Sequence, residues 1–531
     1  MPALVVVAAS VFVSVINASM TTVALPDVQA DFGVADDELA WFITAFLVTM
    51  ASGTVMYGRM VDMHGARRMF LLGMVLFALT SFATAAAPTY WTAVAARTFQ
   101  GLGSTAVPSV GMAAVVRTTT GVERGRFLGV IILAVGIGFG AGPLVGGTLT
   151  EWAGWRAPFV ATGTGAVILV PAALLTMPRV PGFPGQRFDW AGAALLTGAV
   201  TGMLLALNRL PRDITDPAGL AGIGAALPLV GGLALRISTA SQPFISPGLL
   251  RRARFVALCF VGLCIQAVHF GVVVQIPLLL ERYAGLSIIN IGFHLLPGAL
   301  ALGLFGITGG WLAARVGVRP LLIGGTWLLF AGTATFHLAG TGWEPAGVAG
   351  LYVVVAAGFG MANAAALNAA TSELPDELAG TGIGIFNLLF FLGGATSVAT
   401  AGAILRVRET ALEALDPLVR SGRAPEFSDA LIPVLAFAFV AFLIAVAVKP
   451  RAHQGALTAP AAPGLGLTGR LKANRPARKG VAARRVAARG DGRAQSGILV
   501  AGSSHQGAGP GPNGPSQREV AGGRQDGLAP E

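Results

Sequence analysis

The feature that most constrains this 531-residue chain is the recurrence of apolar stretches about as long as a lipid bilayer is thick. A helix needs about 20 apolar residues to cross the hydrocarbon core. With 54% hydrophobic residues, 11% charged residues and a mean hydropathy of +0.71, the chain is predicted to be an all-α polytopic membrane protein. Fourteen spans are expected, at residues 4–25, 39–58, 69–87, 89–116, 127–149, 157–177, 190–208, 218–236, 255–281, 288–313, 320–339, 346–371, 379–405 and 430–448.

The basic residues between the spans predict which side of the membrane each loop occupies, since loops rich in arginine and lysine stay in the cytoplasm. The loops after even-numbered spans hold 14 basic residues, against 8 in the loops after odd-numbered spans. We therefore expect a multi-pass protein of the cell membrane with both termini in the cytoplasm. Four late arginines depart from this pattern: Arg406, Arg408, Arg420 and Arg423.

An internal repeat divides the spans into two halves. Three residues after span 2 recur after span 10 at an offset of 252, namely Gly58, Gly65 and Arg67 as Gly310, Gly317 and Arg319. Parallel repeats with a site at their interface are typical of transporters in which one half rocks against the other. The predicted domains are an N-terminal six-helix bundle (1–180), a central two-helix insertion with its linkers (181–250), a C-terminal six-helix bundle (251–448) and a tail (449–531).

The tail at 449–531 differs in composition from the membrane spans. It contains no Phe, Tyr or Trp and carries 13 basic against 4 acidic residues, a net charge of +9. A segment of this kind cannot bury a core, so we predict a disordered cytoplasmic tail whose basic cluster, Lys472 to Arg489, is drawn to anionic lipids. Because aromatic residues are absent, nucleic-acid binding is not expected.

The fifth span is rich in glycine. At 100° per residue, Gly138, Gly142 and Gly146 fall on one side of a helix, and a second row falls nearly opposite: Gly129, Gly136, Gly140 and Gly147. Small residues at this spacing let neighbouring backbones approach closely. Pro143 lacks an N–H and frees the carbonyl of Phe139. We interpret the span as a pinched helix wedged between two partners and acting as a moving seam; ordinary glycine-rich packing is the alternative.

The loop between spans 2 and 3 carries a second motif, formed by Gly58, Asp62, Gly65, Arg67 and Arg68. Its glycines permit a tight turn, and Asp62 can approach Arg59, Arg67 or a helix N-terminus, where the dipole favours a carboxylate. Such a contact would latch an inner gate, whereas the alternative is that the charges anchor the loop at lipid headgroups. Ala314 replaces Asp62 in the second copy, so any latch is expected on one side only.

These motifs resemble those of the 14-span drug:proton antiporters of the major facilitator superfamily, over residues 1 to about 448. The likeness rests on the span-2 loop, the span-5 glycine-proline motif and three shorter stretches: Val23–Pro26, Arg97–Gly103 and Arg187–Trp190. The resemblance implies the major facilitator fold, with two six-helix bundles plus the central two-helix insertion. It also implies alternating access and proton-coupled efflux of amphipathic drugs or antibiotics.

Further expectations follow for partners and chemistry. The chain is expected to be a transporter and not an enzyme, and to act as a monomer in the bilayer. It has no GxxxxGK[ST] phosphate-binding loop, so no cofactor is expected and the proton gradient is the implied energy source. No metal site is expected. The alternatives are a gradient-driven metabolite facilitator or importer on the same fold, and a non-transporting membrane sensor.

Arg97 is the most informative charged residue within a span. It lies eight residues into span 4, and Asn17 lies eight residues from the end of span 1, so both are about 12 Å deep and could meet across a cavity. Asn17 occupies a place where the family commonly has an aspartate, which argues against proton coupling through span 1 and against permanently cationic substrates. Two interpretations stay open: Arg97 is satisfied by Asn17, Gln100 and carbonyls, or it receives an anionic or polar substrate group.

Three titratable groups are candidates for a proton pathway: His269, Glu281 and His294. Histidine titrates near pH 6.5 in the absence of perturbation. We rank His269 first because it lies near the middle of its span. The alternative for each is a packed or hydrated side chain without a role in coupling.

Overall fold

The computed structural model describes residues 2–119, 121–183, 185–210, 214–409, 413–419 and 424–448. Over these residues the secondary structure is helical without strands, and fourteen helices are long and apolar enough to cross a membrane. The predicted all-α class and number of spans are therefore confirmed. Contacts group the described residues between 2 and 448 into one compact unit. The tail predicted at 449–531 lies outside the described residues.

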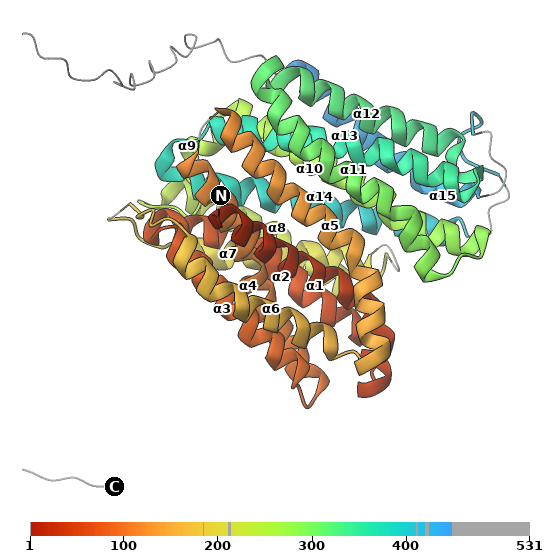
Figure 1. The fold of residues 1–531 in the computed structure, drawn as a ribbon, viewed down its shortest axis with the longest axis horizontal. Coiled ribbons are helices and arrows are strands. Elements are labelled where there is room, and N and C mark those ends of the chain that lie inside the picture. The colour runs from red at the N-terminus through yellow and green to blue at the C-terminus, as the bar shows by residue number, and fades with distance from the viewer. Residues whose placement is uncertain are drawn as a thin grey trace, which may run out of the picture. The chain divides into compact units, whose positions relative to one another are not determined.

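The first six membrane helices form a bundle (Figure 1). They are α1 (Pro2–Phe32), α2 (Asp36–His64), α3 (Ala66–Ala85), α4 (Tyr90–Thr118), α5 (Gly121–Ala153) and α6 (Ala157–Thr176). Helix α1 packs against α5 and α6, and α4 packs against α2 and α3. Thr89 caps α4, because its side chain accepts a hydrogen bond from the Thr92 N–H.

A helical hairpin follows, formed by α7 (Trp190–Arg209) and α8 (Pro217–Thr239). Asp189 fixes its base: the carboxylate accepts hydrogen bonds from the Gly192 and Phe244 N–H groups and pairs with Arg236 at 3.1 Å. Burial would raise the pKa of the Asp189 carboxyl, but these hydrogen bonds hold it below its ordinary value. At the other end of α7, Asn208 donates to Thr44 of α2.

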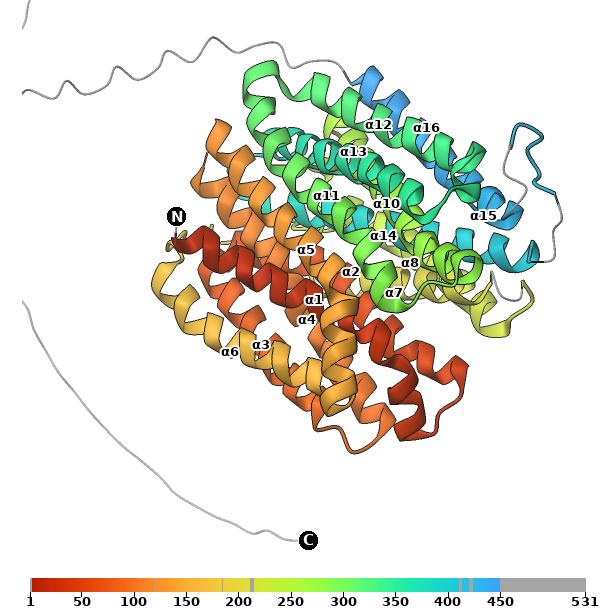
Figure 2. The ribbon, with the colours of Figure 1, turned by 45° about the vertical axis from the view of Figure 1, so that its right-hand side comes forward.

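The second bundle begins after the short helix α9 (Pro247–Leu250). It contains α10 (Ala253–Ala284), α11 (Ile288–Val316), α12 (Val318–Leu338), α13 (Pro345–Ser372), α14 (Ala379–Val407), α15 (Pro425–Ala430) and α16 (Ile432–Ala447), with 3₁₀ turns η1 (Gly340–Gly342) and η2 (Asp376–Leu378). The fourteenth span is therefore divided between α15 and α16. Figure 2 shows α3 and α6 at one edge of the helical unit and α12 and α16 at the other.

The backbone repeats together with the sequence. Gly65 and Gly317 precede α3 and α12 with φ of 88° and 89°, a conformation that favours glycine. Arg67 and Arg319 then each donate to a carbonyl in the last turn of the sixth helix of their own half, at Leu174 of α6 and Val446 of α16. The sequence repeat at an offset of 252 is thus also a structural repeat, because the turn between the second and third helices has the same conformation in both halves.

Helix α5 lies between α1 and α11 (Figure 1). Its two glycine rows face these two partners. A Cβ on Gly129 would lie 2.6 Å from Ile307 of α11, and one on Gly146 would lie 2.8 Å from the Met20 Cα of α1. Helix α5 continues through Pro143, and the carbonyl of Phe139 that this proline frees accepts a hydrogen bond from Ser19 at 3.0 Å. The seam with α1 is therefore both close and hydrogen-bonded.

The two glycine rows have different partners, and one glycine departs from its predicted row. The row of Gly138, Gly142 and Gly146 packs against α1 within one half, so the second row alone meets the other half. Gly147 does not continue that second row, because its nearest neighbour is Val23 of α1 at 3.7 Å. The cause is that α5 and α11 diverge beyond Gly140: a Cβ on Gly292 of α11 would meet nothing within 4 Å.

We predict that Gly142→Val destabilises the purified protein. The new side chain would overlap Ser19, and overpacking of this kind costs about 1–3 kcal/mol. Gly224→Val is the matched control, since nothing lies within 4 Å of a Cβ at that helical position. Thermal unfolding of both variants in detergent checks the prediction, and equal melting temperatures would contradict it.

Candidate functional site

Asp62, near the end of α2, lies at the N-terminus of α14 in the other half. Its carboxylate is fully buried and accepts hydrogen bonds from the N–H groups of Gly380 at 2.9 Å and Thr381 at 2.8 Å. The Thr381 hydroxyl donates a third bond at 2.7 Å. Helix α14 has no side-chain cap from its own N-cap residue, Leu378. Asp62 therefore supplies the missing cap across the two halves and meets the positive end of the helix dipole.

Arg117 completes the charge balance around Asp62. Its guanidinium, from the last turn of α4, lies 2.5 Å from the Asp62 carboxylate, and both side chains are buried. The same arginine donates to the carbonyls of Val61 and Asp376, each at 3.3 Å. Because Asp376 belongs to the turn before α14, Arg117 also bridges the halves. Breaking a buried pair of this kind costs about 3–5 kcal/mol.

Backbone contacts surround this ionic cap and repeat on the other side of the interface. A Cβ on Gly58 would overlap the Gly380 carbonyl of α14, and one on Gly310 would overlap the Gly125 carbonyl of α5. The second helix of each half thus touches the fifth helix of the other half through glycine. The sequence places Ala314 where the first contact has Asp62, so the ionic cap occurs on one side of this paired arrangement.

The structure resolves the alternatives for the loop between α2 and α3. Of the partners open to Asp62, the helix N-terminus is the one it contacts, whereas Arg67 donates to the Leu174 carbonyl. Arg68 is exposed. Sequence reasoning missed Arg117 and Thr381. For Arg117 the available signal was a basic residue directly after predicted span 4.

Arg97 is enclosed within the first bundle, with 1% of its surface exposed. Its guanidinium donates to Gln100 at 2.7 Å, Asn17 at 3.1 Å and the Phe42 carbonyl at 3.4 Å. The Phe46 ring lies 4.1 Å from the guanidinium carbon, close enough for a cation–π interaction. Sequence reasoning missed this aromatic contact, which adds to the stabilisation of a charge in an apolar bundle.

The partners of Arg97 are themselves held in place. Asn17 donates to Thr162 at 2.8 Å, and Gln100 donates to Ser81 at 2.6 Å. Asn17 and Arg97 therefore meet as their depths predicted, but inside one bundle and not across a cavity. This geometry supports the interpretation of a satisfied structural arginine, because its enclosure leaves no face for a substrate.

His269 lies buried between α10 and α13. Its ring stacks on Phe359 with centroids 4.3 Å apart, and its Nε2 lies 3.5 Å from the Tyr352 hydroxyl. The Nδ1 atom is buried without a hydrogen-bond partner in the described part of the chain. The side-chain oxygens of Gln266 and Gln275 are also buried without a hydrogen-bond partner among the described residues. On α10, Gln266 lies one helical turn before His269 and Gln275 about two turns after it. Buried polar atoms without a partner are uncommon in proteins, and each calls for an explanation such as a bound water, an ion or a functional role.

The other two proton candidates do not join His269. Glu281 is exposed near the end of α10, twelve residues or about 18 Å from His269 along the helix. His294 lies on α11, where its Nδ1 is 2.8 Å from the Asn290 carbonyl. The three candidates therefore do not form one cluster.

We predict that Asp62 and Arg117 are energetically coupled. Asp62→Asn leaves Arg117 as an uncompensated buried charge, so it should cost about 3–5 kcal/mol of unfolding free energy, and adding Arg117→Gln should cost far less than its single effect. Glu377→Gln, an exposed acid at the same end, is the control and should change stability by less than about 0.5 kcal/mol. Chemical unfolding in detergent measures this cycle; strictly additive losses would argue against the coupling.

Comparisons with known proteins agree with this architecture. The chain is 26% identical over 325 residues to the riboflavin transporter RibZ of Clostridioides difficile, covering 60% of this chain and 69% of the relative. It is 29% identical over 426 residues to the cephamycin export protein CmcT of Amycolatopsis lactamdurans, covering 75% and 83%.

A solved structure shares the fold. The human organic anion transporter MFSD10 (TETRAN) superposes with a TM-score of 0.59 at 16% identity, covering 84% of this chain and 99% of that one. The family model for the Major Facilitator Superfamily matches residues 7–398. The chain therefore belongs to the Major Facilitator Superfamily and is a membrane transporter of small molecules, not an enzyme.

Proposed function

We propose that the protein exports amphipathic organic compounds in exchange for protons by alternating access. The observation that carries the proposal is the asymmetry of the interface between the halves. Glycine contacts and the Asp62 cap close it at the end where α2 meets α14, whereas α5 and α11 diverge beyond Gly140. An interface closed at one end and diverging at the other is what a transporter needs in its outward-facing state.

The direction of transport follows from topology and relatives. The loop containing Asp62 is basic, so we assign the closed end and both chain termini to the cytoplasm, in the cell membrane. CmcT is named as an export protein, which supports export of antibiotic-like compounds. We further propose that the protein acts as a monomer and without nucleic-acid partners.

Neutral or anionic compounds are the proposed substrates. Asn17 stands where the resemblance leads us to expect an acid, and it is already engaged with Arg97, so span 1 offers no carboxylate to a cationic drug. The close packing of Arg97 also means that the substrate must be recognised elsewhere in the bundle.

His269 is the proposed proton carrier. Its Nδ1 makes no described hydrogen bond, so protonation there would break no existing contact. Aromatic stacking on Phe359 and the nearby Tyr352 hydroxyl hold the ring in place. Movement of the two halves would have to expose this ring to alternate sides of the membrane in turn.

A gradient-driven facilitator or importer is the second candidate function, favoured by the name of the riboflavin transporter RibZ. The two functions differ in their response to protons. A facilitator carries substrate down the substrate's concentration gradient at a rate that does not depend on an imposed pH difference. An antiporter accumulates substrate against that gradient when a pH difference is imposed.

We predict proton-driven uptake of substrate into vesicles that contain the purified full-length protein with its proposed cytoplasmic face toward the outside. A panel of cationic, neutral and anionic compounds should show accumulation of neutral or anionic members when the lumen is acidic. His269→Gln should abolish the response to the pH difference while downhill exchange continues, and His64→Gln, at an exposed position, is the control. Flux that follows only the substrate gradient would support the facilitator, and binding without flux would support a sensor.

A further inference from the structure

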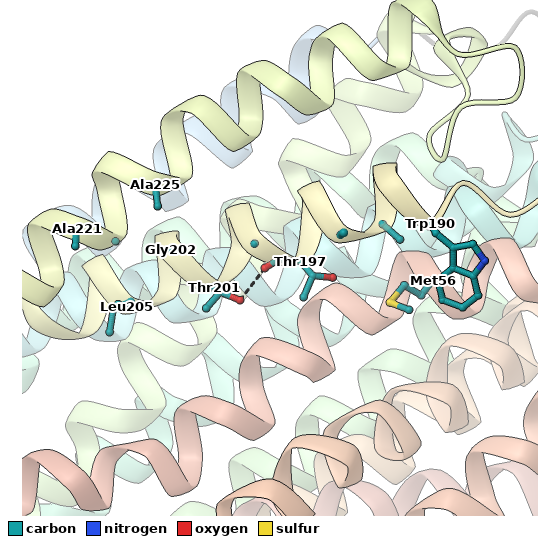
Figure 3. A pocket seen from close by; sticks show the side chains of 12 residues that line it. Met56, Trp190, Thr197, Thr201, Gly202, Leu205, Ala221 and Ala225 are labelled. Atoms are coloured by element: carbon teal, nitrogen blue, oxygen red, sulfur yellow. Dashed lines mark hydrogen bonds between the residues drawn. The ribbon is translucent and has the colours of Figure 1, made fainter. Parts of the chain in front are cut away.

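A groove of about 600 Å³ runs between α7 and α8, with Met56 of α2 contributing to its wall (Figure 3). It extends along α7 from Trp190 to Leu205, fifteen residues or about 22 Å. This is a large part of the roughly 30 Å of a bilayer core. The groove therefore runs along the membrane-spanning helices, which is also the direction in which the acyl chain of a bilayer lipid extends.

Small side chains form the groove. Helices α7 and α8 touch where a Cβ on Gly202 would lie 2.5 Å from the Gly222 carbonyl, and alanines and threonines flank this contact. Ala194 and Ala225 line the groove and are exposed at the surface of the described unit. Since both helices qualify as membrane spans, the groove opens toward lipid, where hydrocarbon is the medium available to fill it.

A buried charge without a partner lies beyond one end of the groove. Arg59 is one helical turn past Met56 on α2, on the side facing α7, and only 7% of its surface is exposed. The described residues provide no hydrogen bond or ion pair to its guanidinium, and its Nε is buried without a partner. A nearby anion that accepts hydrogen bonds from the guanidinium would stabilise a largely buried arginine of this kind.

The nearby carboxylates do not meet this requirement. Arg59 interacts electrostatically with Asp62 and Asp189, but Asp62 is paired with Arg117 at 2.5 Å and Asp189 with Arg236 at 3.1 Å. Three guanidinium groups thus share two carboxylates. One positive charge is left uncompensated, next to the end of an apolar groove.

We propose that Arg59 and this groove together bind a phospholipid with an anionic headgroup. One acyl chain lies along α7 between Trp190 and Leu205, and the headgroup phosphate accepts hydrogen bonds from the Arg59 guanidinium, whose planar donors suit a phosphate. Trp190, 70% exposed at the same end, lies where an indole ring meets the headgroup region. The lipid would join the α7–α8 hairpin to α2 beside the Asp62 cap.

Lipid retention by the purified full-length protein tests this proposal. Native mass spectrometry with dioleoyl phosphatidylglycerol and dioleoyl phosphatidylcholine should show tighter binding of the anionic lipid. Arg59→Gln should weaken phosphatidylglycerol binding by at least about tenfold, the usual worth of a hydrogen bond to a charged group, while Arg59→Lys should keep the preference for the anionic lipid. Arg126→Gln removes an exposed charge near the start of α5 and should leave the affinity for both lipids unchanged.

A second set of measurements separates the groove from the charge. Ala225→Leu narrows the groove without altering charge and should weaken binding of both lipids. The basic tail is present in every variant, so its own attraction for anionic lipids cancels when a variant is compared with the wild type for the same lipid. Equal binding of the two lipids by the wild type, an unchanged affinity in Arg59→Gln, or displacement of the lipid by inorganic phosphate alone would each overturn the proposal.

Discussion

The contact on which the rest of this structure depends is the Asp62 carboxylate at the N-terminus of α14. A helix begins with N–H groups that have no partner within the helix, and a buried start without a cap is costly. Here the cap comes from 318 residues earlier in the chain and from the other half of the protein. Opening this end would leave the start of α14 uncapped and would break the Arg117 bond to the Asp376 carbonyl, whereas the Asp62–Arg117 pair lies within the first half and would stay intact. The closed arrangement is therefore held cooperatively.

Helix α5 presents chemically different faces to its own half and to the other half. Toward α1 its glycines allow a close approach that a side chain would prevent, and Ser19 donates a hydrogen bond to the carbonyl that Pro143 frees. Together these contacts fix α5 within its own bundle. Toward α11 it offers glycine and backbone surface, with few groups that must be re-paired after a shift. The two faces of one helix therefore differ in chemistry, and this difference suits movement between halves more than within them.

Much of the fold could be predicted because it rests on local patterns. Span lengths, the 252-residue repeat and the two-sided glycine rows of span 5 are each readable from periodicity. Asp62 was predicted to have three alternative partners, and choosing between them required knowing which helix starts nearby. Arg97 shows the same limit, because depth placed it beside Asn17 while the direction of both side chains depended on tertiary packing. The neighbour of Gly147 could not be predicted either, because the spacing of glycines along α5 does not show where α5 and α11 diverge.

The central claim is that the Asp62 cap holds the two halves together at one end. Spin labels at exposed positions 64 and 377 report the separation of α2 and α14 at that end, and labels at 152 and 281 report the opposite end. The most direct test compares the distances between these labels, measured by double electron–electron resonance, in the wild type and in Asp62→Asn. The account predicts that the substitution lengthens the 64–377 distance and shortens the 152–281 distance. Unchanged distributions in a folded Asp62→Asn protein would contradict it.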